Sequence, residues 1–229
     1  MALPTLYSAH AAAFASFSTY TGFCVSVEKS KELYPSGIFG VDDSTLVFFI
    51  FTAPAVEIAK TKDITVTAVF ELATYLKEKE GVKTKSVGLG SWINYSWGRA
   101  VFVPAFHSSS LPDGTYGGVA AGIILDIDGV RIYHAGDTCL TGEMKTIKEL
   151  YAPQVAFLPI GGNYTMDVEH AAMATRWLGV RTVIPMHYGS FPEIEADLQR
   201  FAQLIAIGNT TCQIVDPMSI DEKNKKAKK

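Results

Sequence analysis

Apolar and polar positions alternate along the chain so that strands and helices are predicted in turn from about residue 45. Short runs rich in β-branched and aromatic residues predict buried strands, and segments with an apolar face at helical spacing predict helices. The predicted strands span residues 45–51, 64–70, 92–106 (as a hairpin), 119–127, 130–134, 154–159, 181–186 and 212–215. The predicted helices span residues 54–62, 71–81, 142–150, 167–178 and 193–206.

The order of these elements predicts a layered α/β architecture. Asp128-Gly129 separates two apolar runs and is a strong signal for a tight β-hairpin, so the middle of the chain is expected to be antiparallel. Strands and helices then alternate, which is typical of βαβ units. Sheets covered by helices on their outer faces follow from this pattern. No element is predicted in residues 1–44.

Length and composition limit the class of protein. With 229 residues, 48% of them hydrophobic, the chain is expected to form one soluble globular domain over residues 1–220. A net charge of −3 offers no basic surface for nucleic acid, and three widely spaced cysteines suggest neither a disulfide framework nor a cysteine metal site. The charged residues 221–229 are expected to be a disordered tail.

The chain is expected to be cytoplasmic and to have no membrane partner. The most apolar run, residues 46–51, is far shorter than a membrane span of roughly 20 residues. Residues 1–27 carry no Lys, Arg, Asp or Glu, and the basic start of a signal peptide is therefore missing. Reduced cysteines fit the same compartment. A homo-oligomer is left open.

Three side chains able to bind a metal follow separate predicted strands: His107, Asp137 and His187. Loops at strand ends build the sites of open α/β sheets, so these residues can meet at one edge. Two imidazoles and one carboxylate suit Zn²⁺, Mn²⁺ or Fe²⁺ and leave positions open for water. Such a metal lowers the pKa of its bound water to about 7 and makes a hydroxide nucleophile available.

Each of these residues also has an ordinary structural interpretation. A single histidine after a strand is commonly a loop residue, and Asp137 could cap the following helix or close an Asx-turn. His134 could fill the sheet face, and otherwise it would support a metal ligand without binding metal itself. A non-haem iron oxygenase also uses two histidines and a carboxylate, but the alternation after residue 140 disfavours its all-β fold.

Two loops are candidate substrate-binding segments. Residues 107–118 are rich in small and hydroxyl-bearing residues, among them Ser108 and Ser109, and are expected to be flexible. Residues 159–166 combine glycine backbone amides with Asn163 and Thr165, donors that could stabilise an oxyanion or hold a phosphate. Either loop could equally be a plain connection.

Five segments, in this order, resemble the metallo-β-lactamase-fold hydrolases: VFELATYL, AFHSSS, YHAGDT, LPIGGNYTM and IPMHY. The nearest group looks like the small bacterial and archaeal metal-dependent hydrolases related to ascorbate-6-phosphate lactonase, and the likeness covers roughly residues 55–218. The resemblance implies a four-layer αββα sandwich with a metal site along one edge. It also implies that His107 is a ligand of a first metal, Asp137 a bridging carboxylate and His187 a ligand of a second metal, with His134 supporting the turn.

The chain departs from this family before residue 55. The family signature H-x-H-x-D-H would fall at positions 46, 48, 50 and 51, which here are Leu46, Phe48, Ile50 and Phe51. None of these side chains can bind a metal, so the resemblance implies one metal or none instead of a binuclear centre. Three interpretations remain: a weakly bound single metal with some activity, an inactive scaffold, or a non-native sequence over residues 1–54.

The sequence therefore predicts a zinc-dependent hydrolase that acts on an ester, lactone or phosphoester bond of a small molecule through a metal-bound hydroxide. His107, Asp137 and His187 would be its catalytic and metal-binding residues. Ser108, Ser109, Asn163 and Thr165 would contact substrate. The alternative is a catalytically inactive scaffold of the same fold that binds a ligand or partner without metal.

Overall fold

The computed structural model describes residues 24–26, 45–48 and 53–215. Its strands are β1 (Cys24–Ser26), β2 (Thr45–Phe48), β3 (Thr65–Val69), β4 (Thr84–Val87), β5 (Ile93–Tyr95), β6 (Gly98–Pro104), β7 (Ala121–Ile127), β8 (Val130–His134), β9 (Val155–Pro159), β10 (Thr182–Met186) and β11 (Thr211–Cys212). Its helices are α2 (Ala53–Lys62), α3 (Phe70–Glu80), α4 (Glu143–Tyr151), α5 (Val168–Leu178), the 3₁₀-helix η2 (Pro192–Ile194) and α6 (Leu198–Ala206). The predicted tail at 221–229 and the early part of the predicted domain lie outside the described residues.

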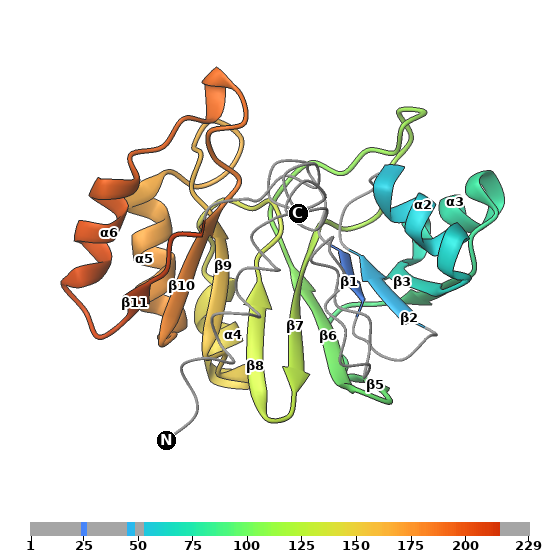
Figure 1. Ribbon diagram of the computed structural model, residues 1–229, viewed down its shortest axis with the longest axis horizontal. Helices are drawn as coiled ribbons and strands as arrows, with labels where there is room; N and C mark the ends of the chain where they lie inside the picture. The colour runs from blue at the N-terminus through green and yellow to red at the C-terminus, as the bar shows by residue number, and fades with distance from the viewer. Residues whose placement is uncertain (1–23, 27–44, 49–52, 216–229) are drawn as a thin grey trace, which may run out of the picture.

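The strands form two sheets, which Figure 1 shows between two sets of helices. The small sheet has the order β1-β2-β3-β4, and the large sheet has the order β11-β10-β9-β8-β7-β6-β5. Strands β5 to β8 pair antiparallel, whereas β8 to β11 pair parallel. The predicted change from hairpins to βαβ units is therefore confirmed.

Alternating side chains on the large sheet build two separate cores. Phe102 and Ile123 face the small sheet and share a core with Leu72 of helix α3. Val101 and Ile124, their neighbours along the same strands, face the other way and pack with residues of α4, α5 and α6. A strand with both faces buried places successive side chains in different cores. The result is the predicted αββα sandwich, with α2 and α3 on one outside and α4, α5 and α6 on the other (Figure 1).

Most boundaries follow the local signals in the sequence. Asp128 and Gly129 both have positive φ, 51° and 81°, as a two-residue type I′ turn requires. Gly81 ends α3 in the left-handed conformation with φ of 66°. The predicted strand at 45–51 is observed at Thr45–Phe48, and its last residues lie outside the described part.

One helix prediction is wrong. Residues 193–206 do not form a single helix, because a 3₁₀ turn at Pro192–Ile194 is followed by extended backbone at Glu195. Helix α6 begins only after Asp197, whose carboxylate accepts a hydrogen bond from the backbone N–H of Arg200. This is an N-cap, and it fixes the start of the helix at Leu198, five residues later than the apolar pattern indicates. The strand predicted at 212–215 is observed at Thr211–Cys212.

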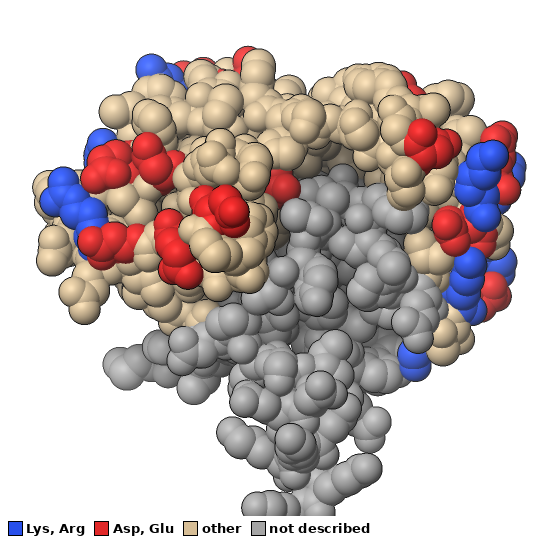
Figure 2. Space-filling model, turned by 90° about the horizontal axis from the view of Figure 1, so that it is seen from above, with Lys and Arg blue, Asp and Glu red and all other residues tan. Residues whose placement is uncertain are grey.

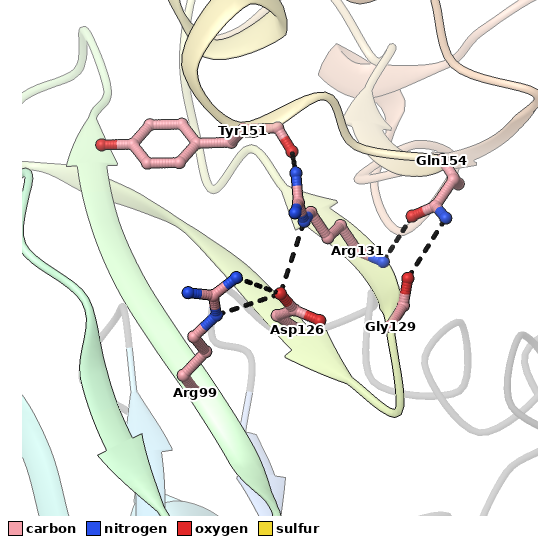
Figure 3. A network of polar contacts seen from close by, with 6 residues as sticks. All are labelled: Arg99, Asp126, Gly129, Arg131, Tyr151 and Gln154. Carbon is pink, nitrogen blue, oxygen red and sulfur yellow. Dashed lines mark hydrogen bonds and ion pairs between the residues drawn. The ribbon is translucent and has the colours of Figure 1, made fainter.

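A polar network holds the hairpin end of the large sheet, away from the candidate residues (Figure 3). The Asp126 carboxylate accepts hydrogen bonds from Arg99 Nε and Nη2, at 3.0 and 2.7 Å, and from Arg131 Nε at 3.4 Å. Arg131 also donates to the backbone carbonyl of Tyr151 at 2.7 Å, and Gln154 bridges Arg131 to Gly129. These contacts connect β6, β7 and β8 to the end of α4 and hold the three strands together at this end of the sheet.

Within the described residues, none of the helices combines the length and the apolar character that crossing a membrane requires.

Candidate functional site

The three predicted ligands follow strands that run in the same direction. His107 comes after β6, Asp137 after β8 and His187 after β10. Because β7 is antiparallel to both β6 and β8, those two strands are parallel to each other, and β8, β9 and β10 pair parallel. The carboxyl ends of β6, β8 and β10 therefore lie along one edge of the large sheet, the upper edge in Figure 1.

Hydrogen bonds to a buried threonine join the first two of these loops. The backbone N–H of Phe106 donates to Thr138 Oγ1 at 3.0 Å, and the N–H of Cys139 donates to the carbonyl of Phe106 at 3.2 Å. Thr138 is fully buried, and its hydroxyl donates to the Cys139 carbonyl. His107, which follows Phe106, and Asp137, which precedes Thr138, consequently line one cavity of about 400 Å³.

The segment from His134 to Asp137 is a sharp turn that depends on glycine. Gly136 has a φ of 65°, and a Cβ there would lie 2.8 Å from the backbone oxygen of Ala121. The Gly136 N–H donates to His134 Nδ1 at 3.1 Å, and the imidazole stacks on Phe157 with ring centroids 5.8 Å apart. Burial lowers the pKa of His134 to about 3, so the ring is neutral and its Nδ1 can accept. His134 thus stabilises the turn that carries Asp137, and its support of a metal ligand stays a prediction.

His187 is buried and lies opposite Asp137. Its Nε2 is 3.8 Å from Asp137 Oδ2, beyond hydrogen-bonding distance, while its Nδ1 is buried without a hydrogen-bond partner. Its backbone is left-handed, with a φ of 53°, and the backbone of Gly161 packs directly against its carbonyl. A non-glycine residue in this conformation costs of order 1 kcal/mol and commonly marks a functional position.

The pair formed by Asp137 and His187 fits a metal ion. Two ligands about 2.0–2.1 Å from a tetrahedral metal lie roughly 3.3 Å apart, so a small closure of the 3.8 Å gap would suffice. A carboxylate and a neutral imidazole are also donors that Zn²⁺, Mn²⁺ and Fe²⁺ accept.

The third predicted ligand does not complete this pair. Across the described parts of the chain, no group of three or more His, Cys, Asp or Glu side chains is placed to hold a metal. His107 is exposed, and its Nδ1 donates to the backbone carbonyl of Ser108 at 2.9 Å, which leaves Nε2 without a proton in the neutral ring. His107 lines the cavity with Asp137 but stands apart from the Asp137–His187 pair.

The loop at 107–118 contains hydrogen bonds of its own, and its expected flexibility stays a prediction. Ser110 and Tyr116 form an antiparallel bridge, and the Asp113 carboxylate accepts hydrogen bonds from the hydroxyl and backbone N–H of Thr115. These bonds also lower the pKa of Asp113. Ser108 and Ser109 line the cavity, as a substrate-binding role would require.

The loop at 159–166 is used differently from the prediction. The Gly162 N–H, expected to be a free donor, is bonded to the Met166 carbonyl at 2.9 Å inside a tight turn. Asn163 is exposed, whereas the Thr165 hydroxyl is buried without a hydrogen-bond partner. Neither residue is part of the lining of the cavity that His107 and Asp137 share.

Sequence reasoning missed the residues that shape the site. Thr138 was visible in the segment YHAGDT, but nothing in the text indicated that its hydroxyl would join two loops 32 residues apart. Val69 and Leu72, which also line the cavity, come from a predicted strand and a predicted helix to which the sequence assigned no role in a site.

Two sheets between two sets of helices form the metallo-β-lactamase fold, and comparisons with known proteins agree. Residues 54–188 match the family model described as beta-lactamase superfamily domain. The chain belongs to that superfamily.

The relatives carry names that describe a metal-dependent activity. A UPF0173 metal-dependent hydrolase from Methanoculleus marisnigri is 48% identical over 141 residues, which are 60% of this chain and 62% of that protein. Another from Bacillus cytotoxicus is 44% identical over 166 residues, 70% of this chain and 72% of that protein. The chain thus spans just under two thirds of the first relative.

A solved structure shows the same fold. Igni18, a metallo hydrolase from the archaeon Ignicoccus hospitalis, is 35% identical, and the match covers 77% of each chain with a TM-score of 0.69. The predicted resemblance to the metallo-β-lactamase-fold hydrolases is therefore confirmed.

Proposed function

We propose that this protein is a metal-dependent hydrolase that cleaves an ester, lactone or phosphoester bond of a small molecule. One observation carries the proposal: Asp137 Oδ2 and His187 Nε2 face each other at 3.8 Å without a hydrogen bond, beside a cavity that Asp137 and His107 line. The names of the relatives support the reaction class.

The residues of the chain would divide the work as follows. Asp137 and His187 would hold the metal, for which zinc is the first candidate and manganese or iron the alternatives. When bound, such a metal lowers the pKa of a coordinated water to about 7. His107, whose Nε2 is free to accept a proton, would take one from water or donate one to the leaving group. The hydroxyls of Ser108 and Ser109 would orient the substrate carbonyl or phosphoryl oxygen.

A second candidate function is an inactive scaffold that binds its ligand without metal. It is favoured by the absence, among the residues described, of a three-ligand group. Catalytic zinc sites ordinarily have three protein ligands, and two would hold a metal more weakly.

Metal content and melting temperature separate the two candidates. Purified protein is analysed for metal, and its melting curve is measured with zinc and with chelator, because a ligand of the native state alone raises the melting temperature. We expect zinc to raise it by several degrees and His187→Ala to remove the effect. His170→Ala is the matched control, since His170 is exposed on α5. No response to zinc, manganese or iron would leave the inactive scaffold as the better candidate.

A further inference from the structure

The cavity beside Asp137 differs in character from a phosphate-binding site. Its lining includes the aliphatic side chains of Val69, Leu72, Leu111, Pro112 and Val119. Its polar part is the run Ser108–Ser110, which offers neutral hydroxyls. A volume of about 400 Å³ is in the lower part of the range of pockets for small molecules.

The charges at the cavity are negative. Among the residues that the structure describes, Asp137 and His107 are the titratable ones that line the cavity, and neither Lys nor Arg does. The Glu71 carboxylate lies directly against Gly118, because a Cβ on Gly118 would overlap Glu71 Oε2. The neighbours of Gly118 in the chain, Gly117 and Val119, line the cavity. In the face shown in Figure 2, the Lys and Arg side chains of the described residues lie mainly on the outer flanks.

We infer that the substrate is an uncharged ester or lactone with an aliphatic acyl group, and not a phosphoester. This rests on the proposed function and narrows it. A phosphoester carries negative charge, and proteins that bind one supply arginine, lysine or helix N-termini for its oxygens. Here a metal at Asp137 would compensate that carboxylate, but the described part of the lining adds no further positive charge. The aliphatic wall instead gains affinity with each methylene that it covers, about fourfold per group.

Binding of hydrolysis-resistant probes tests the inference without requiring turnover. Affinities for the amide series from propanamide to hexanamide, and for hexylphosphonate, are measured by calorimetry on the full chain with chelator. We expect affinity to rise about fourfold per methylene along the amides. Hexanamide should bind at least about tenfold more tightly than hexylphosphonate. The preference should persist in Asp137→Asn, because the other lining residues keep their aliphatic side chains and neutral hydroxyls.

A variant pair localises the preference to the cavity. Val119 lines the cavity and is 49% exposed, so a longer side chain there can be accommodated. Val119→Lys should lower the ratio of hexanamide affinity to hexylphosphonate affinity about tenfold, or make hexylphosphonate the tighter ligand. Val119→Met, whose side chain is of similar length and uncharged, should leave this ratio unchanged. Tight phosphonate binding by the wild type and Val119→Met, or amide affinities that do not depend on chain length, would overturn the inference.

Hydrolysis is measured separately on zinc-loaded protein, with 4-nitrophenyl butyrate and 4-nitrophenyl phosphate. Faster cleavage of the butyrate supports both proposals. Faster cleavage of the phosphate overturns the substrate class and supports the hydrolase. If the amide preference holds but neither compound is cleaved, the proposed function fails while the assignment of the cavity stands.

Discussion

The hydroxyl of Thr138 and the backbone N–H of Phe106, 32 residues apart in sequence, share a partly buried hydrogen bond of 3.0 Å. This bond connects the loop after β6 with the loop after β8, so His107 and Asp137 line the same cavity. The site therefore depends on a contact between residues that would bind neither metal nor substrate.

Thr138→Val tests this connection. Valine has nearly the same shape but leaves the Phe106 N–H without its acceptor, which should lower the free energy of unfolding by about 1–3 kcal/mol. Loss of a bond that orients a ligand should also weaken zinc binding about tenfold. Urea denaturation and zinc titration measure the two effects. Thr175→Val is the control, because Thr175 is equally buried but donates to Ala171 within α5. Equal zinc affinity in all three proteins would contradict the role.

The buried imidazole of His134 predicts how stability depends on pH. Its pKa is about 3 in the folded protein and about 6.5 in the unfolded chain, so below pH 6.5 the unfolded chain takes up a proton that the native state refuses. Stability is thus fully present above pH 6.5 and falls as the pH drops from 6.5 toward 3. The contribution is about 1.4 kcal/mol per pH unit.

His134→Asn isolates that contribution. Asparagine can still accept a hydrogen bond from the Gly136 N–H but does not titrate. Between pH 7 and pH 5, the free energy of unfolding of the variant should therefore fall by about 2 kcal/mol less than that of the wild type. Urea denaturation in chelator at pH 7, 6 and 5 measures the slope. His170→Asn, at an exposed position, should keep the wild-type slope. If the free energy of unfolding of His134→Asn depends on pH as steeply as that of the wild type, His134 does not remain neutral in the folded protein.

The sequence was sufficient for features with a local signal. The hairpin at Asp128-Gly129 and the end of α3 at Gly81 follow from backbone preferences of single residues, and both are observed. The strand-end positions of His107, Asp137 and His187 follow from periodicity, and strand direction then places them at one sheet edge. Local chemistry and topology therefore locate the edge where a site can form.

The sequence was not sufficient for distances between side chains. That His187 meets Asp137 at 3.8 Å while His107 stays apart depends on how three loops pack, which no periodicity encodes. The predicted helix at 193–206 failed for a related reason, since the N-cap at Asp197 prevailed over an apolar pattern that runs on through Ile194. Short strands such as β4 were missed because their exposed positions leave no apolar alternation.

The Asp126 network should contribute to stability alone. Asp126→Asn removes the negative charge that faces Arg99 and Arg131, and should lower the free energy of unfolding by about 1–3 kcal/mol without changing zinc affinity. Asp63→Asn is the control, because its pair with Lys83 is exposed on both sides and such pairs contribute about 0–1 kcal/mol. A loss of zinc binding in Asp126→Asn would mean that the hairpin end and the site are coupled.

Substitutions at Gly129, in the hairpin, and at Gly136, at the site, distinguish the cost of backbone strain from the cost of close packing. Both Gly129 and Gly136 have positive φ, 81° and 65°, but a Cβ at Gly129 would meet nothing within 4 Å, whereas one at Gly136 would lie 2.8 Å from the Ala121 oxygen. Gly129→Ala should therefore cost only the left-handed conformation of an L-residue, about 1–2 kcal/mol. Gly136→Ala should cost a further ~1–3 kcal/mol from the overlap.

Their effects on function should differ more than their effects on stability. Gly136→Ala must displace the turn that carries Asp137, so zinc affinity and any hydrolysis should fall at least about tenfold. Loss of a residue that orients a metal ligand has an effect of this size. Gly129→Ala, at the opposite end of the same strand, should retain both. Zinc titration and the butyrate assay on folded samples of the two variants measure the difference. If Gly136→Ala folds and binds zinc like Gly129→Ala, the geometry of this turn does not determine the position of the Asp137 carboxylate.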